Sequence, residues 1–158
     1  MHKGIVTALI PTAYLLGITA DARWTATLQP QNGTKVSGTA VVEARGADST
    51  RFSVSIRGAT PNTSLKWHLH NGKCTEDGTV VGIETSYPEL MPGGGGTAES
   101  MVVLPVAPPS SGAFSIHVHG PAKAGGGSGS AAAYSAGSMG MDKSTVACGD
   151  LKPLGANP

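Results

Sequence analysis

Residues 51–58 read RFSVSIRG, and this stretch indicates the fold class of the chain. Its apolar residues, at every second position from Phe52 to Ile56, alternate with serines and an arginine. One face of an extended strand would therefore be apolar and the other polar. The preceding stretches WTATLQP (24–30) and KVSGTAVVEA (35–44) alternate in the same way, and turn-forming residues separate the three. The first third of the chain predicts short antiparallel strands.

Further strand-like stretches follow, and no segment is a credible helix. Glycine is abundant (23 residues) and aromatic residues are few (4%), which suits short strands joined by turns better than a helical bundle. Residues 84–96 read as a loop, and 121–140 as a long Gly/Ser/Ala excursion without periodicity. We expect an all-β antiparallel sandwich or barrel of about eight strands. The further predicted strands are LKWHLH (65–70), GTVVGI (78–83), TAESMVVLPV (97–106), AFSIHVHG (113–120) and STVACGDL (144–151).

The first 22 residues have the features of an export signal. A short basic start precedes the apolar stretch IVTALIPTAYLLGITA (5–20), and small residues around Ala22 suit a cleavage site. A membrane anchor is the alternative, but the apolar run is short for a span and contains Pro11. We expect cleavage near Ala22 and one domain over residues 23–158. The mature protein would be periplasmic or extracellular and would have no membrane span.

The charge and the cysteines narrow the class of protein further. The net charge is +1 and basic residues form no run, which argues against a nucleic-acid partner. Cys74 and Cys148 are the two cysteines, and an even number in an exported protein favours a disulfide. Their use as metal ligands is the alternative. It is less favoured because neither lies in a C-x-x-C pair or beside a histidine at ligand spacing.

After the predicted signal, every histidine falls in one of two H-x-H pairs, His68 with His70 and His117 with His119. Residues i and i+2 of a strand share a face, so each pair offers two imidazoles side by side. If the two strands are neighbours, four nitrogens converge, and a tetragonal set of four nitrogens suits Cu(II) better than zinc. The alternative is two pairs of surface or half-buried imidazoles without a metal. The sequence thus predicts a copper site.

Three motifs resemble those of copper/zinc superoxide dismutases. RGATPNTSLKWHLHNGKC (57–74) is similar to that family's strand, in which H-x-H is followed by a disulfide cysteine. FSIHVHG (114–120) resembles the strand that ends on the last copper histidine, and STVACGDL (144–151) resembles the final strand with the second cysteine. The order of the motifs and the upstream NGTKVSGTAVVE (32–43) agree as well.

The resemblance implies a Greek-key β-barrel of eight strands with one disulfide, between Cys74 and Cys148. It also implies that His68, His70 and His119 are copper ligands, and so the catalytic residues of a dismutase. These assignments come from the matched motifs and cover most of the expected mature chain.

The chain also departs from that family. Residues 75–116 contain no histidine, so the bridging histidine and a separate zinc site are not expected. Thr145 stands where the family has an arginine that guides superoxide, which predicts weak dismutation. His117 would supply the fourth nitrogen in place of the bridging histidine. The alternative is that His117 packs or hydrogen-bonds beside the site.

Three functions follow from these residues. The first is an exported copper enzyme that dismutes superoxide to O₂ and peroxide, and the second is a copper-binding or copper-delivery module that meets a copper donor or acceptor. The third is an interaction domain without a metal. Met139 and Met141 bear on the second, because thioethers suit Cu(I). Their alternative role is to fill gaps in a loop.

Overall fold

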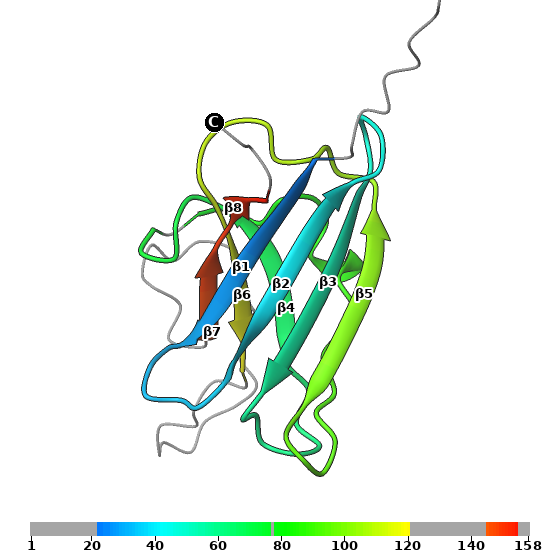
Figure 1. Cartoon of the computed structure of the whole chain (residues 1–158). Coiled ribbons are helices and arrows are strands. Elements are labelled where there is room, and N and C mark those ends of the chain that lie inside the picture. Colours follow the sequence, from blue (N-terminus) through cyan, green and yellow to red (C-terminus); the bar gives the residue numbers. More distant parts are fainter. Residues whose placement is uncertain (1–21, 77, 121–144, 155–158) are drawn as a thin grey trace, which may run out of the picture.

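The computed structural model describes residues 22–76, 78–120 and 145–154, and this part of the chain is all-β (Figure 1). The predicted fold class is therefore confirmed. One short 3₁₀ helix, η1 (Glu84–Ser86), is present. The strands are β1 (Arg23–Pro30), β2 (Ser37–Ala44), β3 (Thr50–Arg57), β4 (Lys66–Asn71), β5 (Ala98–Leu104), β6 (Phe114–His119), β7 (Thr145–Asp150) and β8 (Lys152–Pro153).

Three predictions concern residues outside the described part of the chain. These are the export signal over residues 1–22, of which only Ala22 is described, the excursion over residues 121–140, and the copper-transfer role of Met139 and Met141. Among the described residues, no helix is long and apolar enough to cross a membrane.

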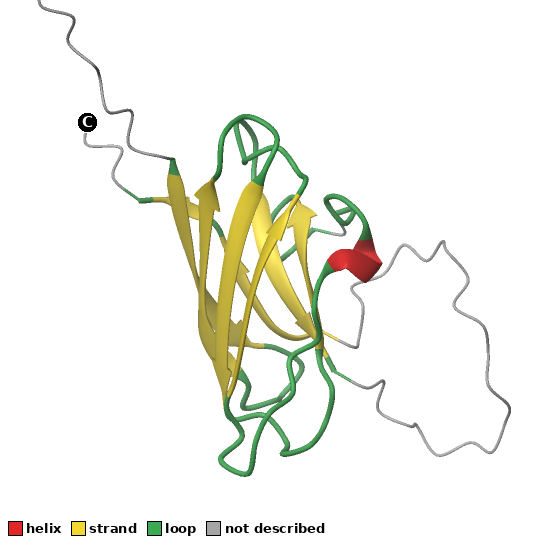
Figure 2. Ribbon diagram, turned by 90° about the vertical axis from the view of Figure 1, so that its right-hand side faces the viewer, coloured by secondary structure: helices red, strands yellow, loops and turns green. Residues whose placement is uncertain are grey.

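The strands form one antiparallel sheet in the order β4-β6-β7-β1-β2-β3-β5, and β8 pairs with β1. In space, β1, β2, β3 and β5 make one layer, and β7, β6 and β4 lie behind it (Figures 1 and 2). The chain crosses from β3, which is next to one edge of the sheet, to β4 at the opposite edge, and then returns from β4 to β5 at the first edge. These long crossings, in place of a simple meander, are those of a Greek key.

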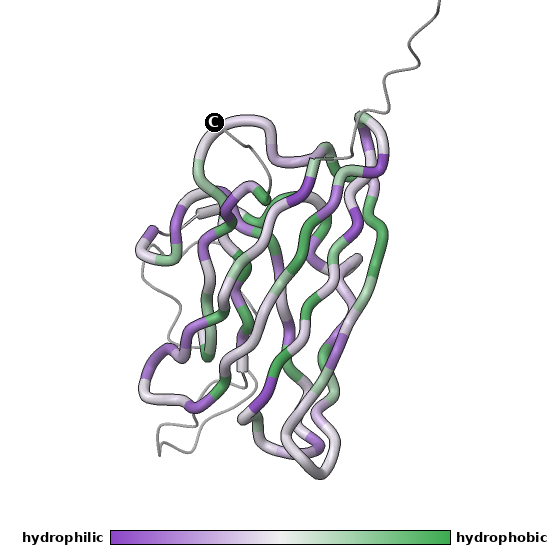
Figure 3. The backbone as a smooth tube through the Cα atoms, in the orientation of Figure 1, coloured by the Kyte–Doolittle hydropathy of each residue, from purple (hydrophilic) through white to green (hydrophobic). Residues whose placement is uncertain are grey.

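Alternation along the strands builds the core, as hydropathy along the chain shows (Figure 3). On β3, Phe52, Val54 and Ile56 are all buried, as predicted. Phe52 packs on Trp67 from the other layer, with ring centroids 6.0 Å apart, and Tyr87 lies 5.1 Å from Trp67. The two layers therefore close on an aromatic cluster.

The connection from β4 to β5 covers the free edge of β4. Leu65 and Leu90 exchange backbone hydrogen bonds of 2.9 and 2.8 Å, and the amide of Val81 donates to the Leu69 carbonyl. The predicted strand over residues 78–83 is reduced to a single bridge between His70 and Val80. The two glycines at its ends interrupt the extended run.

The disulfide between Cys74 and Cys148 is present, as predicted. It joins the loop after β4 to β7, across a sequence separation of 74 residues. A loop of that length stabilises the fold by about 4 kcal/mol in the chain-entropy model. In this oxidised state the two sulfurs are bonded to each other, so neither is available as a thiolate ligand while the disulfide is present.

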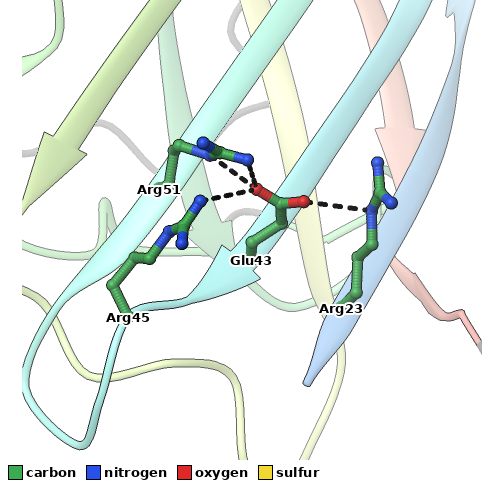
Figure 4. Close-up of polar contacts among 4 residues, drawn as sticks. All are labelled: Arg23, Glu43, Arg45 and Arg51. Carbon is green, nitrogen blue, oxygen red and sulfur yellow. Dashed lines mark hydrogen bonds and ion pairs between the residues drawn. The ribbon is translucent and has the colours of Figure 1, made fainter. Parts of the chain in front are cut away.

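A cluster of charged side chains links β1, β2 and β3 near one end of their layer (Figure 4). Glu43 on β2 lies in register between Arg23 on β1 and Arg51 on β3. Its carboxylate pairs with Arg23 at 3.3 Å, with Arg45 at 3.6 Å and with the Arg51 guanidinium. Exposed pairs contribute little singly, but one half-buried carboxylate shared by cations on both neighbouring strands, and by Arg45 in the turn, favours this register.

We predict that Phe52→Ala lowers the free energy of unfolding by about 3–5 kcal/mol, because it leaves a cavity against Trp67 and Tyr87. Ser53→Ala, on the opposite face of the same strand, is the matched control and should change stability by about 0.5 kcal/mol or less. Urea denaturation measures both. Equal effects of the two substitutions would contradict the assignment of the core face.

Candidate metal centre

The two H-x-H pairs lie on neighbouring strands. β4 and β6 pair antiparallel, and His68 stands directly opposite His117. Trp67 and Val118, also opposite each other, are fully buried in the core. Since side chains alternate, all four imidazoles lie on the outer face of this layer. The condition set by the sequence, two adjacent strands, is therefore met.

Three of the four histidines form a compact group, which we call the three-histidine group: His68, His70 and His119. One ring nitrogen of each lies within 4.8 Å of the others. The ring centroids are 5.3 to 6.0 Å apart. Imidazole nitrogens bound to one ion at about 2.0–2.1 Å stand at most about 4.2 Å from one another. Small ring rotations would thus allow all three to bind the same ion.

A register shift between β6 and β7 places His119. Val118 pairs with Ala147, but His119 pairs with Thr145, so the ladder skips Val146. Such bulges bend a strand and re-aim its side chains, often beside functional sites. Thr145 Oγ1 lies 3.5 Å from His119 Nδ1. A hydroxyl, not a guanidinium, therefore stands next to this histidine.

His70 is held as a metal ligand commonly is. Its Nδ1 lies 2.8 Å from the Gly78 carbonyl, and because a carbonyl only accepts, Nδ1 carries the proton. In the neutral ring Nε2 bears the lone pair, and this atom is buried without a hydrogen-bond partner among the described residues. A backbone carbonyl that fixes one nitrogen while the other stays unpaired is the usual surrounding of a ligating histidine. Only glycine fits at position 78, because a Cβ there would overlap the Asn71 carbonyl oxygen.

His68 is buried and electrostatically destabilised as a cation. Burial, with smaller contributions from His70, Lys66 and His117, lowers the pKa of His68 from 6.5 to about 4. At neutral pH the ring is therefore neutral, the state that binds metal without first losing a proton. Tyr87 packs its ring edge against His68 at 5.4 Å, and its hydroxyl donates to the Val81 carbonyl.

His117 lies beside the three-histidine group rather than within it. Its ring stacks on His70, with centroids 4.4 Å apart, and its Nε2 is 3.0 Å from Ser115 Oγ. Its ligand nitrogen groups instead with the sulfurs of Cys74 and Cys148, within 4.8 Å. The structure thus brings together three of the four predicted ligands and places His117 against the disulfide.

One acidic residue lies near the site although the sequence did not predict it to be a site residue. Glu84 Oε1 lies 3.9 Å from His68 Nε2, and the carboxylate is largely exposed. Glu84 belongs to the short helix η1, in the loop that folds back over β4. The sequence offers no signal for this contact, since the loop has no periodic pattern to place it.

No family model matches the chain, and no curated protein matches it at a significant level. The likeness to copper/zinc superoxide dismutases remains a resemblance in three motifs. What the structure shows is a cluster of histidines and cysteines that could hold a metal ion.

We predict that the imidazole of His68 titrates near pH 4 in the metal-free protein. In the unfolded chain the same imidazole has its ordinary pKa of 6.5. The free energy of unfolding is therefore not reduced by His68 above about pH 6.5, and it falls as the pH drops toward 4 because the unfolded chain then binds more protons. The loss amounts to at most about 3 kcal/mol.

NMR titration of the histidine rings measures the first effect. Urea denaturation of the protein and of His68→Gln measures the change in stability. The difference between their free energies of unfolding should narrow between pH 6.5 and pH 4, because only the protein with His68 loses this contribution. A His68 midpoint near 6.5 would contradict the burial of this ring.

Proposed function

We propose that this is an exported copper-binding protein whose three-histidine group holds one copper ion for the dismutation of superoxide. The observation that carries the proposal is the surrounding of His70, whose Nδ1 donates to the Gly78 carbonyl while its buried Nε2 has no hydrogen-bond partner among the described residues. An unpaired buried nitrogen is costly, and a metal ion would satisfy it. His68 supports the proposal because it is neutral at physiological pH.

The donor set suits copper. Three imidazoles bind Cu(II) well, and they also form a catalytic zinc site, so copper is proposed because, of these two metals, only copper has the two oxidation states that dismutation needs. Bound copper would cycle between Cu(II) and Cu(I), taking an electron from one superoxide and giving it to the next. The disulfide is consistent with an oxidising compartment outside the cytoplasm.

The chain's own residues then have distinct roles. Gly78 holds the His70 ring in one tautomer, and Tyr87 and the loop after β4 keep His68 away from water. Trp67 and Leu69 anchor the strand from the core side, so that the two histidines between and after them keep their positions. Because the imidazoles are held in this way, they lose little conformational entropy when they bind an ion.

Copper delivery without turnover is the second candidate, and Thr145 favours it. A neutral hydroxyl beside His119 supplies no positive charge to attract an anion. The two functions separate by assay: a dismutase removes superoxide, whereas a carrier transfers Cu(I) to an acceptor without removing superoxide.

We predict that the purified protein binds one Cu(II) and that His70→Gln weakens this binding at least tenfold. His117→Gln is the matched variant from the same face, and it should change the affinity by less than about threefold because His117 lies outside the three-histidine group. Competition against a chromophoric chelator measures both. Equal losses in the two variants would contradict a site built from three histidines.

The catalytic part has its own test on the same samples. Copper-loaded protein should remove superoxide faster than an equal concentration of chelated copper, and His70→Gln should lose the difference. If the copper-loaded protein has the expected affinity but removes no superoxide, the proposed dismutase activity is wrong. Copper delivery is then the function to test, by transfer of Cu(I) to an acceptor.

A further inference from the structure

A second group of metal-binding residues lies next to the three-histidine group, at the disulfide. His117 on β6 stands directly opposite Cys148 on β7 in the sheet. Cys74 reaches the same point from the loop after β4, through the disulfide. A ring nitrogen of His117 and the two sulfurs lie within 4.8 Å of one another. His117 and Cys148 are buried, and Cys74 is half-buried.

We propose that, once the disulfide is reduced, Cys74, Cys148 and His117 bind a zinc ion. Two thiolates and one imidazole form a known type of zinc ligand set, with the fourth position left to solvent. In the oxidised protein the two sulfurs are bonded to each other and do not bind metal as thiolates. The site therefore exists only in the reduced state, so the disulfide acts as its redox switch.

The chemistry balances with a dithiol as the reductant. The dithiol gives two electrons and two protons to the disulfide, its own sulfurs join, and the bond between Cys74 and Cys148 breaks into two thiols. Zinc then binds both sulfurs with release of the two thiol protons, and His117 binds through a neutral nitrogen. No other reactant is needed.

The backbone around the disulfide suits this change. The Cα atoms of the two cysteines are 5.8 Å apart. Two sulfurs bound to one tetrahedral zinc at about 2.3 Å stand about 3.8 Å apart, a separation that side-chain rotation can reach from this backbone. Ser115 Oγ lies 3.0 Å from Nε2 of His117 and holds the ring. β6 and β7 keep His117 and Cys148 in register whether or not the sulfurs are joined.

The disulfide is also accessible to a small reductant. A surface hollow of about 330 Å³ opens over Cys74 and Cys148, and polar residues such as Thr27, Gln31 and Asp150 line it. The Asp150 carboxylate accepts a hydrogen bond from the Cys74 amide at 2.7 Å, which holds the loop after β4 in place beside β7. A dithiol can therefore approach the disulfide from the side of Cys74, the half-buried one of the two cysteines.

This second site is independent of the proposed copper function. It shares no ligand with the three-histidine group, although the His117 ring stacks on His70 and on His119. Failure of one therefore leaves the other intact.

Cobalt substitution tests the proposal, because Co(II) replaces zinc and thiolate ligands give it a charge-transfer absorption. The full-length protein is reduced with a phosphine, which adds no competing thiol, and titrated with Co(II) and then Zn(II). We expect one ion with thiolate absorption in the reduced protein and none in the oxidised protein. Zn(II) should displace the cobalt signal.

Variants assign the ligands. Cys74→Ser should abolish the thiolate signal of a two-sulfur site, and His117→Gln should weaken zinc binding at least tenfold. His70→Gln, from the three-histidine group, is the control and should leave the thiolate signal unchanged. Circular dichroism of each reduced sample reports whether the sheet persists.

Two results would overturn the proposal. One is the absence of thiolate absorption in reduced protein. The other is equal zinc affinity of the reduced protein and of His117→Gln. If reduction unfolds the chain, the cysteines could bind zinc without the sheet, and the effect of His117→Gln would vanish. That outcome therefore counts against the proposed site as well.

Discussion

The pairing of β4 with β6 is the constraint on which the rest of the site depends. Trp67 and Leu69 face Val118 and Ile116 across this pair, and all four side chains are fully buried. A slip of one residue would turn these side chains to solvent and the histidines into the core, at a cost of several kcal/mol. The hydrophobic core thus fixes the register, and the register fixes which imidazoles meet.

The sequence alone predicts those strands in which apolar and polar residues alternate. The strand around Phe52 and both H-x-H strands were predictable because a period of two assigns each side chain to a face. The disulfide was predictable as the favoured pairing of two cysteines in a chain that is expected to be exported. The position of His119 was not, because it depends on the register shift opposite Val146, which leaves no local pattern. Nor were the contacts of Glu84 and Gly78, since they depend on how an aperiodic loop folds over β4.

The same reasoning explains the different surroundings of the four histidines. The H-x-H spacing places both members of a pair on one face, but it does not say which neighbours each meets across the sheet. His117 sits in the middle of β6, between His68 on one side and Cys148 on the other. His119, at the end of that strand, lies past the register shift and joins His68 and His70. One face of the sheet therefore carries two adjacent groups of metal-binding residues, in contact through the stacked rings of His70 and His117.

A crystal structure of the copper-loaded, oxidised protein, with anomalous data collected at the copper edge, tests the central claim most directly. We predict one copper peak, with a nitrogen of His68, His70 and His119 each about 2.0–2.1 Å away and with His117 still against the disulfide. A peak elsewhere on the molecule, or a peak bound by His117 in place of one of these three, would contradict the three-histidine site.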